Sequence, residues 1–459
     1  METKKDITRR DFLKVAGTGA VLSAAALAGC RPAGNKPSAT GGALGDIPTD
    51  KMEYRTNPNT GDRVSLLGYG CMRWPVHTGA DGRQEIDQET VNQLVDTAIA
   101  HGVNYFDTAP AYIRGWSERA TGIALARHPR DKWFIATKAS NFGGPFDLEG
   151  CKNMFRRSMS EMQVDCIDYY LLHSLGGDLE GFHQRFVDSG FLDFLLEERA
   201  AGRIRNLGWS FHGRKEVFDY ILNFRDIKWD FCQIQLNYQD WTIPIGASIA
   251  AEYLYNELVK KNVAVVIMEP LLGGRLARVP EQALAMMNNM HPGDTAAKWA
   301  FRFAGTPPGV LTVLSGMVYM EHLQENLRTF APFTPMNDAE YAVLDDVTDI
   351  LANADYIQCT TCEYCMPCPY GLDIPQIFAH YNKCVSAGQM LTSSDDDNYN
   401  KARRAFLVGY DRSVSKLRQA DRCINCEQCM PKCPQGIKIP VEMAKVDAYA
   451  EKLRQKLAF

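Results

Sequence analysis

Short aliphatic and β-branched runs alternate with amphipathic stretches of helical period between about residue 63 and residue 331. The runs that predict strands are Val64–Cys71, Asn104–Thr108, Trp133–Lys138, Ile167–His173, Arg205–Ser210, Cys232–Asn237, Val263–Glu269 and Val310–Ser315. The stretches that predict helices are Gln88–Ala100, Ser117–Ala126, Leu148–Glu161, Gly190–Ala200, Lys215–Asn223, Ile249–Lys260, Thr295–Phe303 and Met320–Phe330. This alternation predicts an α/β protein with a closed (β/α)8, or TIM, barrel, whose reactive side chains lie at the carboxyl ends of the strands.

Four side chains of different chemistry lie at the ends of three neighbouring predicted strands. Asp107 ends the second strand and Tyr112 follows it, Lys138 ends the third strand, and His173 ends the fourth. Each residue alone also suits a structural role, such as a turn cap or a core histidine. Together they bring an acid, a phenol, an amine and an imidazole to one mouth of the barrel, and we therefore expect a catalytic site there.

In order and context these four residues resemble the catalytic tetrad of the aldo/keto reductases. Further similarities are Ser117-Glu118, Gly208-Trp209-Ser210, Gln233 and Glu325-Asn326. The resemblance implies hydride transfer between NAD(P) and a small carbonyl or alcohol substrate. Tyr112 would donate the proton, with its pKa lowered by the neighbouring Lys138. Asp107 would hold Lys138 in place, and His173 would orient and polarise the carbonyl.

The resemblance also implies a dinucleotide site at the ends of the later strands. The positions expected to contact the dinucleotide are Ser210, Gln233, Leu271, Gly273, Gly274, Ser315, Gly316, Met317, Glu325 and Asn326. Met268 stands where family members often have an aromatic ring against the nicotinamide. Gly316 and His322 stand where basic residues often bind the 2′-phosphate. NAD and NADP therefore both remain open as the cofactor.

Two runs of cysteine near the end of the chain account for eight of its fourteen cysteines. The first run is Cys359, Cys362, Cys365 and Cys368-Pro369, and the second is Cys423, Cys426, Cys429 and Cys433-Pro434. Cysteines with two residues between them, closed by Cys-Pro, are typical of two-cluster ferredoxins. Structural zinc is the alternative, because C-x2-C pairs also bind zinc. Each run supplies four cysteines by itself, however, and this favours two [4Fe-4S] clusters.

The fourth cysteine of each run is expected to ligate the cluster held by the other run. One cluster would then be held by Cys359, Cys362, Cys365 and Cys433, and the other by Cys423, Cys426, Cys429 and Cys368. The first run is one residue shorter before its Cys-Pro, so Cys368 departs from the usual spacing. The tail resembles the small α-helical dicluster ferredoxin domain that one branch of the aldo/keto reductases carries.

The N-terminus has the pattern of a targeting segment. Thr8-Arg9-Arg10-Asp11-Phe12-Leu13-Lys14 resembles a twin-arginine export signal, and Val15–Ala28 is a short apolar stretch. Leu27-Ala28-Gly29-Cys30 then resembles a lipobox. The alternative is an ordinary leader with a chance cysteine. The twin-arginine route carries folded proteins, so we expect export with preformed clusters and a lipid on Cys30 that anchors the protein at the periplasmic or extracytoplasmic face of a membrane.

Length and composition fit this organisation. We expect a signal at residues 1–30, a Gly/Pro/Ser-rich tether at 31–50, the barrel at 51–335 and the ferredoxin-like domain at 336–459. The formal net charge is −5, with acidic and basic residues interspersed, so nothing indicates a nucleic-acid partner.

Two functions are compatible with these features. The first is an aldo/keto oxidoreductase that relays electrons through its clusters to a redox partner protein or a quinone-linked donor. The second is a non-catalytic electron-transfer lipoprotein that uses the barrel as a docking scaffold. Because all four tetrad residues are present, the sequence favours the enzyme.

Overall fold

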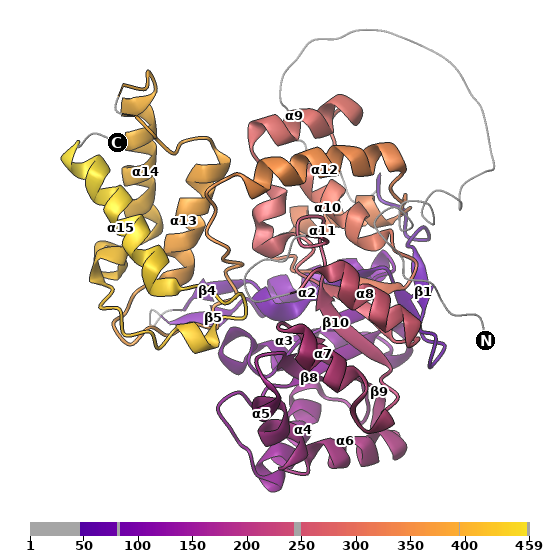
Figure 1. Cartoon of the computed structure of the whole chain (residues 1–459). Coiled ribbons are helices and arrows are strands. Elements are labelled where there is room, and N and C mark those ends of the chain that lie inside the picture. The colour runs from indigo at the N-terminus through magenta and orange to yellow at the C-terminus, as the bar shows by residue number, and fades with distance from the viewer. Residues whose placement is uncertain (1–45, 80–82, 243–248, 394, 457–459) are drawn as a thin grey trace, which may run out of the picture.

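The computed structural model describes residues 46–79, 83–242, 249–393 and 395–456 (Figure 1). The expected twin-arginine motif, the lipobox with Cys30 and most of the tether lie outside these residues. Among the described residues, no helix is long and apolar enough to cross a membrane.

Parallel strands close into a barrel, and this confirms the predicted fold class. Its strands are β3 (Leu67–Gly70), β6 (Tyr105–Asp107), β7 (Phe134–Ala139), β8 (Ile167–Leu175), β9 (Ile204–Phe211), β10 (Phe231–Gln235), β11 (Ala264–Met268) and β12 (Val310–Ser315). They are hydrogen-bonded in the order β10, β11, β12, β3, β6, β7, β8, β9, and β9 pairs with β10 to complete the ring. Each pair of consecutive strands is joined through helical segments, as parallel neighbours require.

The predicted helices all form, with bounds that differ from the expected ones by no more than two residues. They are α2 (Gln88–Ala100), α3 (Ser117–Leu125), α4 (Leu148–Met162), α6 (Phe191–Ala200), α7 (Lys215–Leu222), α8 (Ala251–Lys260), α10 (Ala296–Gly305) and α11 (Met320–Phe330). Side-chain caps explain several of the starts. Asp87 accepts from Thr90 N at α2, Asp147 accepts from Gly150 N at α4, and Thr295 accepts from Lys298 N at α10.

The first predicted strand, Val64–Cys71, is two elements rather than one. β2 (Arg63–Ser65) pairs antiparallel with β1 (Tyr54–Thr56), and only β3 enters the barrel. The hairpin closes the amino-terminal end of the barrel, where Val64 packs with Tyr105 and Tyr169 near the starts of their strands. The apolar run Val64–Cys71 is divided because its first part covers this end of the barrel core while its second part forms a barrel strand.

Several short or peripheral elements had no prediction. They are β4 (Val76–Thr78), β5 (Gln84–Ile86), α5 (Leu179–Phe182), α9 (Glu281–Met290) and α12 (Asp338–Ala352). A capping box starts α12, in which Asn337 and Glu340 exchange hydrogen bonds between side chain and backbone. The sequence had placed α12 in the second domain, but its buried residues belong to the hydrophobic core of the barrel.

Three longer helices form a separate unit beside the barrel (Figure 1). They are α13 (Ile374–Ser386), α14 (Tyr399–Ser413) and α15 (Ile439–Gln455), and they surround a hydrophobic core of their own. The barrel core ends at Tyr356 and the second core begins at Ile357. The change between the two cores therefore falls after α12, whereas the expected boundary lay before it. The cysteine runs are loops that precede α13 and α15.

Candidate active site and cluster sites

Asp107 and Lys138 form a buried ion pair at the carboxyl ends of β6 and β7. Lys138 Nζ donates to Asp107 Oδ1 over 2.5 Å and to the carbonyl of Thr108 over 2.8 Å. Their side chains are only 4% and 1% exposed, respectively. Burial raises the pKa of Asp107 and lowers that of Lys138, while each charge opposes the effect on the other. The pair is thus held by its own hydrogen bonds, as a buried pair must be.

The phenol of Tyr112 lies over this ion pair. Tyr112 begins the one-turn helix η3 (Tyr112–Gly115), and Lys138 Nζ lies 5.0 Å from the centre of its ring. Burial raises the pKa of Tyr112 well above its usual value, and Tyr364 and Asp107 raise it further. In this structure burial therefore outweighs any lowering of this pKa by the neighbouring Lys138. Tyr112 is a protonated phenol, ready to donate.

His173, at the end of β8, faces Tyr112 edge to face, with 5.9 Å between the ring centres. Its Nδ1 lies 2.6 Å from Ser140 Oγ, and Arg185 donates to its backbone carbonyl over 2.7 Å. Burial lowers the pKa of His173 well below 6.5, and the charges of Lys138 and Arg185 lower it further. The imidazole is therefore neutral. In the tautomer in which Nδ1 accepts from the serine hydroxyl, Nε2 carries the proton and can donate to an oxygen atom.

A residue from the first cysteine run reaches this site. The hydroxyl of Tyr364 lies 3.1 Å from His173 Nε2, and its ring centre lies 5.8 Å from that of Phe142. A hydrogen bond with Tyr364 also contributes to the raised pKa of Tyr112. Sequence reasoning missed Tyr364. The available signal was the aromatic residue in Cys362-Glu363-Tyr364-Cys365, where the second run has Gln428 in Cys426-Glu427-Gln428-Cys429.

Two of the expected nicotinamide contacts lie side by side on adjacent strands. Ser210 and Gln233 are register partners on β9 and β10. Ser210 Oγ accepts from Ser174 N over 2.7 Å, which leaves its own hydrogen free to donate. Gln233 Nε2 lies 3.5 Å from Met268 Sδ, while Gln233 Oε1 is buried and has no hydrogen-bond partner among the described residues. An unpaired acceptor and a free donor fit a carboxamide, which has both groups.

The expected adenosine contacts are tied to the last strand and helix. Asn326 on α11 donates to Ser315 at the end of β12 over 2.9 Å. Glu325 accepts from Thr295 over 2.5 Å, which connects α11 to the start of α10. Met317 is buried, and its carbonyl accepts from Tyr69, whereas Gly316 is exposed.

The loop expected to bind the dinucleotide phosphates is covered by the first cysteine run. This loop, η7 (Leu272–Ala277), holds Gly273 at φ 68° and Gly274 at φ 97°. A Cβ on Gly273 would meet the backbone of Thr360, at 2.4 Å from its carbonyl oxygen. The N–H of Gly274 already bonds the carbonyl of Leu271. In this docked arrangement the nicotinamide end of the site is present, and Thr360 covers the loop expected at the phosphate end.

The thiols expected for one cluster lie together beside the barrel. Burial raises the pKa values of Cys359, Cys362 and Cys365, and interactions of each with neighbouring thiols raise them further. Cys433, from the other run, raises the pKa of all three thiols and therefore lies close to them. The carboxyl of Glu269, the residue after β11, raises the pKa of Cys359 and Cys362 as well, so these thiols lie near the end of β11.

The thiols of the second group surround a small cavity. Its lining comprises Cys368, Tyr370, Leu372, Ile374, Cys423, Ile424, Cys426, Glu427, Cys429, Ile439, Pro440 and Met443. Cys368 lies with this group despite its irregular spacing in the sequence. Together with Cys423 and Cys426 it raises the pKa of Cys429. A cavity lined by four cysteines and by mostly apolar residues fits a [4Fe-4S] cube.

The two runs also share local backbone geometry. Thr361 and Glu363 flank the second cysteine of the first run with φ of 54° and 67°. Asn425 and Glu427 flank the second cysteine of the other run with φ of 57° and 59°. The loops are therefore two copies of one cluster-binding turn, as the repeated sequence indicates.

Hydrogen bonds fix the first cysteine run and its partner loop on the barrel mouth. Arg73 donates to the carbonyls of Thr360 and Thr361 over 3.0 and 2.9 Å. Arg275, in the phosphate loop, donates to Gln358. Gln435, just after the second Cys-Pro, donates to Gln235 at the end of β10 over 3.1 Å, and this contact is buried. The docking is thus built from specific polar contacts.

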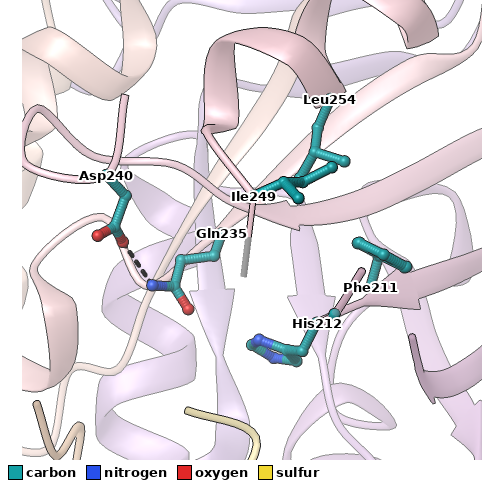
Figure 2. Close-up of a pocket in the computed structure, with 7 residues that line it drawn as sticks. Phe211, His212, Gln235, Asp240, Ile249 and Leu254 are labelled. Carbon is teal, nitrogen blue, oxygen red and sulfur yellow. Dashed lines mark hydrogen bonds between the residues drawn. The ribbon is translucent and has the colours of Figure 1, made fainter. Parts of the chain in front are cut away.

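A small pocket lies beside this last contact (Figure 2). It is lined by Phe211, His212, Gly213, Gln235, Asp240, Ile249 and Leu254. In Figure 2 the amide of Gln235 points to Asp240, to which it donates, and His212 lies on the other side. Burial lowers the pKa of His212 to about 4, so its imidazole is neutral.

Comparison with protein families divides the chain at the same place as the hydrophobic cores. A model of the aldo/keto reductase family matches residues 66–349, which is more than half of the chain. A model described as a 4Fe-4S dicluster domain matches residues 358–438, which include both cysteine runs. The tail therefore binds two [4Fe-4S] clusters, and the zinc alternative is set aside.

Individual relatives match the barrel. An uncharacterized oxidoreductase of Bacillus subtilis is 24% identical over 296 residues, which cover 58% of this chain and 87% of that protein. L-galactose dehydrogenase of Arabidopsis thaliana is 25% identical over 300 residues, which cover 60% of this chain and 88% of that protein. The structure of an aldo-keto reductase from Klebsiella pneumoniae in complex with NADPH has a TM-score of 0.51 at 21% identity, and covers 65% of this chain and 96% of that one. That structural likeness shows a shared fold.

Proposed function

Since this chain belongs to the aldo/keto reductase family and carries a 4Fe-4S dicluster domain, we propose that it interconverts a small carbonyl compound and its alcohol while its two clusters carry the electrons. The observation that supports this most strongly is the assembled tetrad. Lys138 is paired with Asp107 beneath the ring of Tyr112, and a neutral His173 faces that ring. A barrel that served only for docking would not require a buried ion pair and a phenol to be assembled beside each other.

The protein's own groups supply the proton and bind the oxygen. His173 Nε2 would donate a hydrogen bond to the carbonyl oxygen and hold it beside Tyr112. As hydride reaches the carbonyl carbon, the oxygen gains negative charge and takes the proton of the Tyr112 hydroxyl. Lys138 would stabilise the phenolate left behind, and Asp107 keeps the lysine in place. The Tyr112 hydroxyl is protonated at neutral pH, so its proton is available for reduction.

NAD(P) is the proposed hydride carrier. When bound, its nicotinamide exchanges a hydride with the carbonyl carbon. Ser210 and Gln233 would hold the carboxamide, which the unpaired Oε1 of Gln233 supports. Ser315, Glu325 and Asn326 would lie near the adenosine half. The phosphate loop requires Thr360 to move off Gly273 before it can contact the phosphates.

The clusters would match the electron count of this chemistry. A hydride carries two electrons and one proton, whereas a [4Fe-4S] cluster exchanges one electron. Two clusters together take or supply the pair. We propose Cys359, Cys362, Cys365 and Cys433 as ligands of the cluster beside the barrel. The cluster at the cavity would take Cys423, Cys426, Cys429 and Cys368.

We further propose that the protein is exported through the twin-arginine route and anchored by a lipid on Cys30. The sequence Thr8–Lys14 and the lipobox support this. Free nicotinamide is scarce outside the cytoplasm, so the dinucleotide would be exported bound and recycled in place by the clusters. The external electron partner would be a redox protein or a quinone-linked donor at the membrane.

The experiment is anaerobic purification of the mature protein, followed by iron and sulfide analysis, analysis of released nucleotide and reduction of a panel of aldehydes. The proposal predicts eight iron and eight sulfide per chain, which are two [4Fe-4S] clusters, and reduction of at least one aldehyde. Intact clusters with no turnover of any carbonyl and no affinity for NAD(P) would contradict the enzyme and favour the docking scaffold.

A further inference from the structure

Tyr364 contacts the same two groups that would bind a substrate oxygen. Its hydroxyl lies 3.1 Å from His173 Nε2, the imidazole nitrogen that is free of Ser140. The Tyr112 hydroxyl is also close enough for Tyr364 to contribute to its raised pKa, and the Tyr112 ring faces His173 with 5.9 Å between the ring centres. A carbonyl oxygen between Tyr112 and His173 would meet these same two donors, so it and the Tyr364 hydroxyl are mutually exclusive.

Tyr364 lies in a loop that is held both by its neighbouring cysteines and by hydrogen bonds to the barrel. Two residues that belong to one cluster group, Cys362 and Cys365, stand on either side of it in the chain. Arg73 fixes the same loop to the barrel through Thr360 and Thr361. The matching residue of the second run, Gln428, is exposed. Only the cysteine run that lies at the tetrad therefore has a tyrosine at this position.

A second residue of this loop covers the other half of the site. Thr360 is buried, and its backbone lies where a Cβ of Gly273 would be. Gly273 is in the loop expected to bind the dinucleotide phosphates. One segment, residues 358–364, thus covers the oxygen site with Tyr364 and the phosphate loop with Thr360.

We propose that Tyr364 is an active-site positioning residue contributed by the cluster domain, and that its hydroxyl holds the place of the substrate oxygen between Tyr112 and His173. Without substrate, Tyr364 keeps both donors paired and oriented. Substrate binding exchanges this hydroxyl for the substrate oxygen and moves the loop that carries Cys362 and Cys365. The first cluster therefore senses the occupancy of the barrel site. This inference rests on the proposed function, since it uses the tetrad as the oxygen-binding site.

The test uses benzoate, whose carboxylate offers an oxygen to both donors but is not reduced. Binding to the anaerobic holoprotein is measured by calorimetry for wild type, Tyr364→Phe and the control Gln428→Ala. Removal of the competing hydroxyl should tighten benzoate binding about threefold to tenfold in Tyr364→Phe, and leave it unchanged in Gln428→Ala. Equal affinities in wild type and Tyr364→Phe, or no binding to either, would overturn the proposal.

A second readout separates positioning from packing. In wild type, benzoate should alter the EPR signal of the reduced cluster bound by Cys359, Cys362 and Cys365, and leave the other cluster signal unchanged. Tyr364→Phe should weaken that response because the exchange of hydroxyl for ligand is lost. An unaltered spectrum in wild type would contradict the coupling.

Failure of the proposed function has a different signature. If no aldehyde is reduced by wild type, the enzymatic assignment fails whatever benzoate does. If aldehydes are reduced and Tyr364→Phe has a KM about threefold to tenfold lower with kcat within about twofold, the positioning role holds. A large fall in kcat without a change in KM would instead make Tyr364 a proton donor, and would overturn the inference.

Discussion

The hydroxyl of Tyr364 lies 3.1 Å from Nε2 of His173, although 191 positions separate the two residues in the sequence. His173 lies near the carboxyl end of β8, and Tyr364 stands between two cysteines of the cluster domain. The contact makes the barrel mouth and the first cluster one structural unit. It brings Tyr364, which lies between two of the cysteines proposed to hold a cluster, within hydrogen-bonding distance of a tetrad residue.

Replacement of Tyr112 by Phe should abolish carbonyl reduction and leave the clusters intact. The change removes the proton donor but keeps the ring over Lys138, so the turnover number should fall at least about a hundredfold. Steady-state kinetics with the aldehyde that wild type reduces best provides the measurement. The cluster absorbance and the iron content should match wild type. Unchanged turnover would refute the role of Tyr112 as proton donor.

Removal of one partner of the Asp107–Lys138 pair should destabilise the protein more than removal of both charges. Lys138→Met leaves a buried carboxylate without its partner, so the free energy of unfolding should fall by about 3–5 kcal/mol. The double variant Asp107→Asn with Lys138→Met should recover a large part of that loss, because no charge remains unpaired. Denaturant unfolding followed by tryptophan fluorescence gives both values. Equal losses in the single and double variants would contradict a coupled pair.

Carbonyl reduction should be insensitive to pH between about 6.5 and 9. The pKa of Tyr112 is raised above its usual value near 10, so its proton is present throughout this range. The pKa of His173 is lowered below 6.5, so its imidazole is neutral throughout. Oxidation of the alcohol needs Tyr112 as a base, so its rate should rise with pH over the same interval. A pH profile of kcat in each direction measures this, and a midpoint near 7 in the reduction profile would contradict it.

Substitutions of cysteine should group the ligands across the two runs. Cys433→Ser should disturb the same cluster signal as Cys359→Ser, although Cys433 belongs to the other run. Cys368→Ser should disturb the signal that Cys423→Ser disturbs, since both line the same cavity. EPR of the dithionite-reduced variants, with iron counts, distinguishes the two signals. If Cys368→Ser matches Cys359→Ser instead, each run holds its own cluster.

The barrel was predictable because its strands and helices carry strong, regular patterns, and the tetrad followed from their strand ends. Helices α9 and α12 and the small hairpins escaped prediction. The strands of the hairpins have three residues each, too few to show a period. Helix α12 packs on the barrel core, although it follows the expected domain boundary in the chain.

Contacts between the two units were beyond the sequence for a different reason. Tyr364, Thr360 and Gln435 meet the barrel only because the cluster loops dock on its mouth. No local pattern encodes that docking. Tyr364 also contributes to the raised pKa of Tyr112, and this contribution exists only in the docked structure. The grouping of Cys368 with Cys423, Cys426 and Cys429, by contrast, was expected from the Cys-Pro pattern, and these four residues line one cavity.

The most direct test of the link between barrel and clusters is an anaerobic single-turnover experiment. The holoprotein is reduced in its clusters, freed of excess reductant, and mixed with the aldehyde that it reduces best, while cluster absorbance and alcohol are followed together. The account predicts reoxidation of two clusters for each alcohol formed in wild type, and neither reoxidation nor alcohol in Tyr112→Phe. Alcohol formed while the clusters stay reduced, or clusters reoxidised equally in Tyr112→Phe, would contradict it.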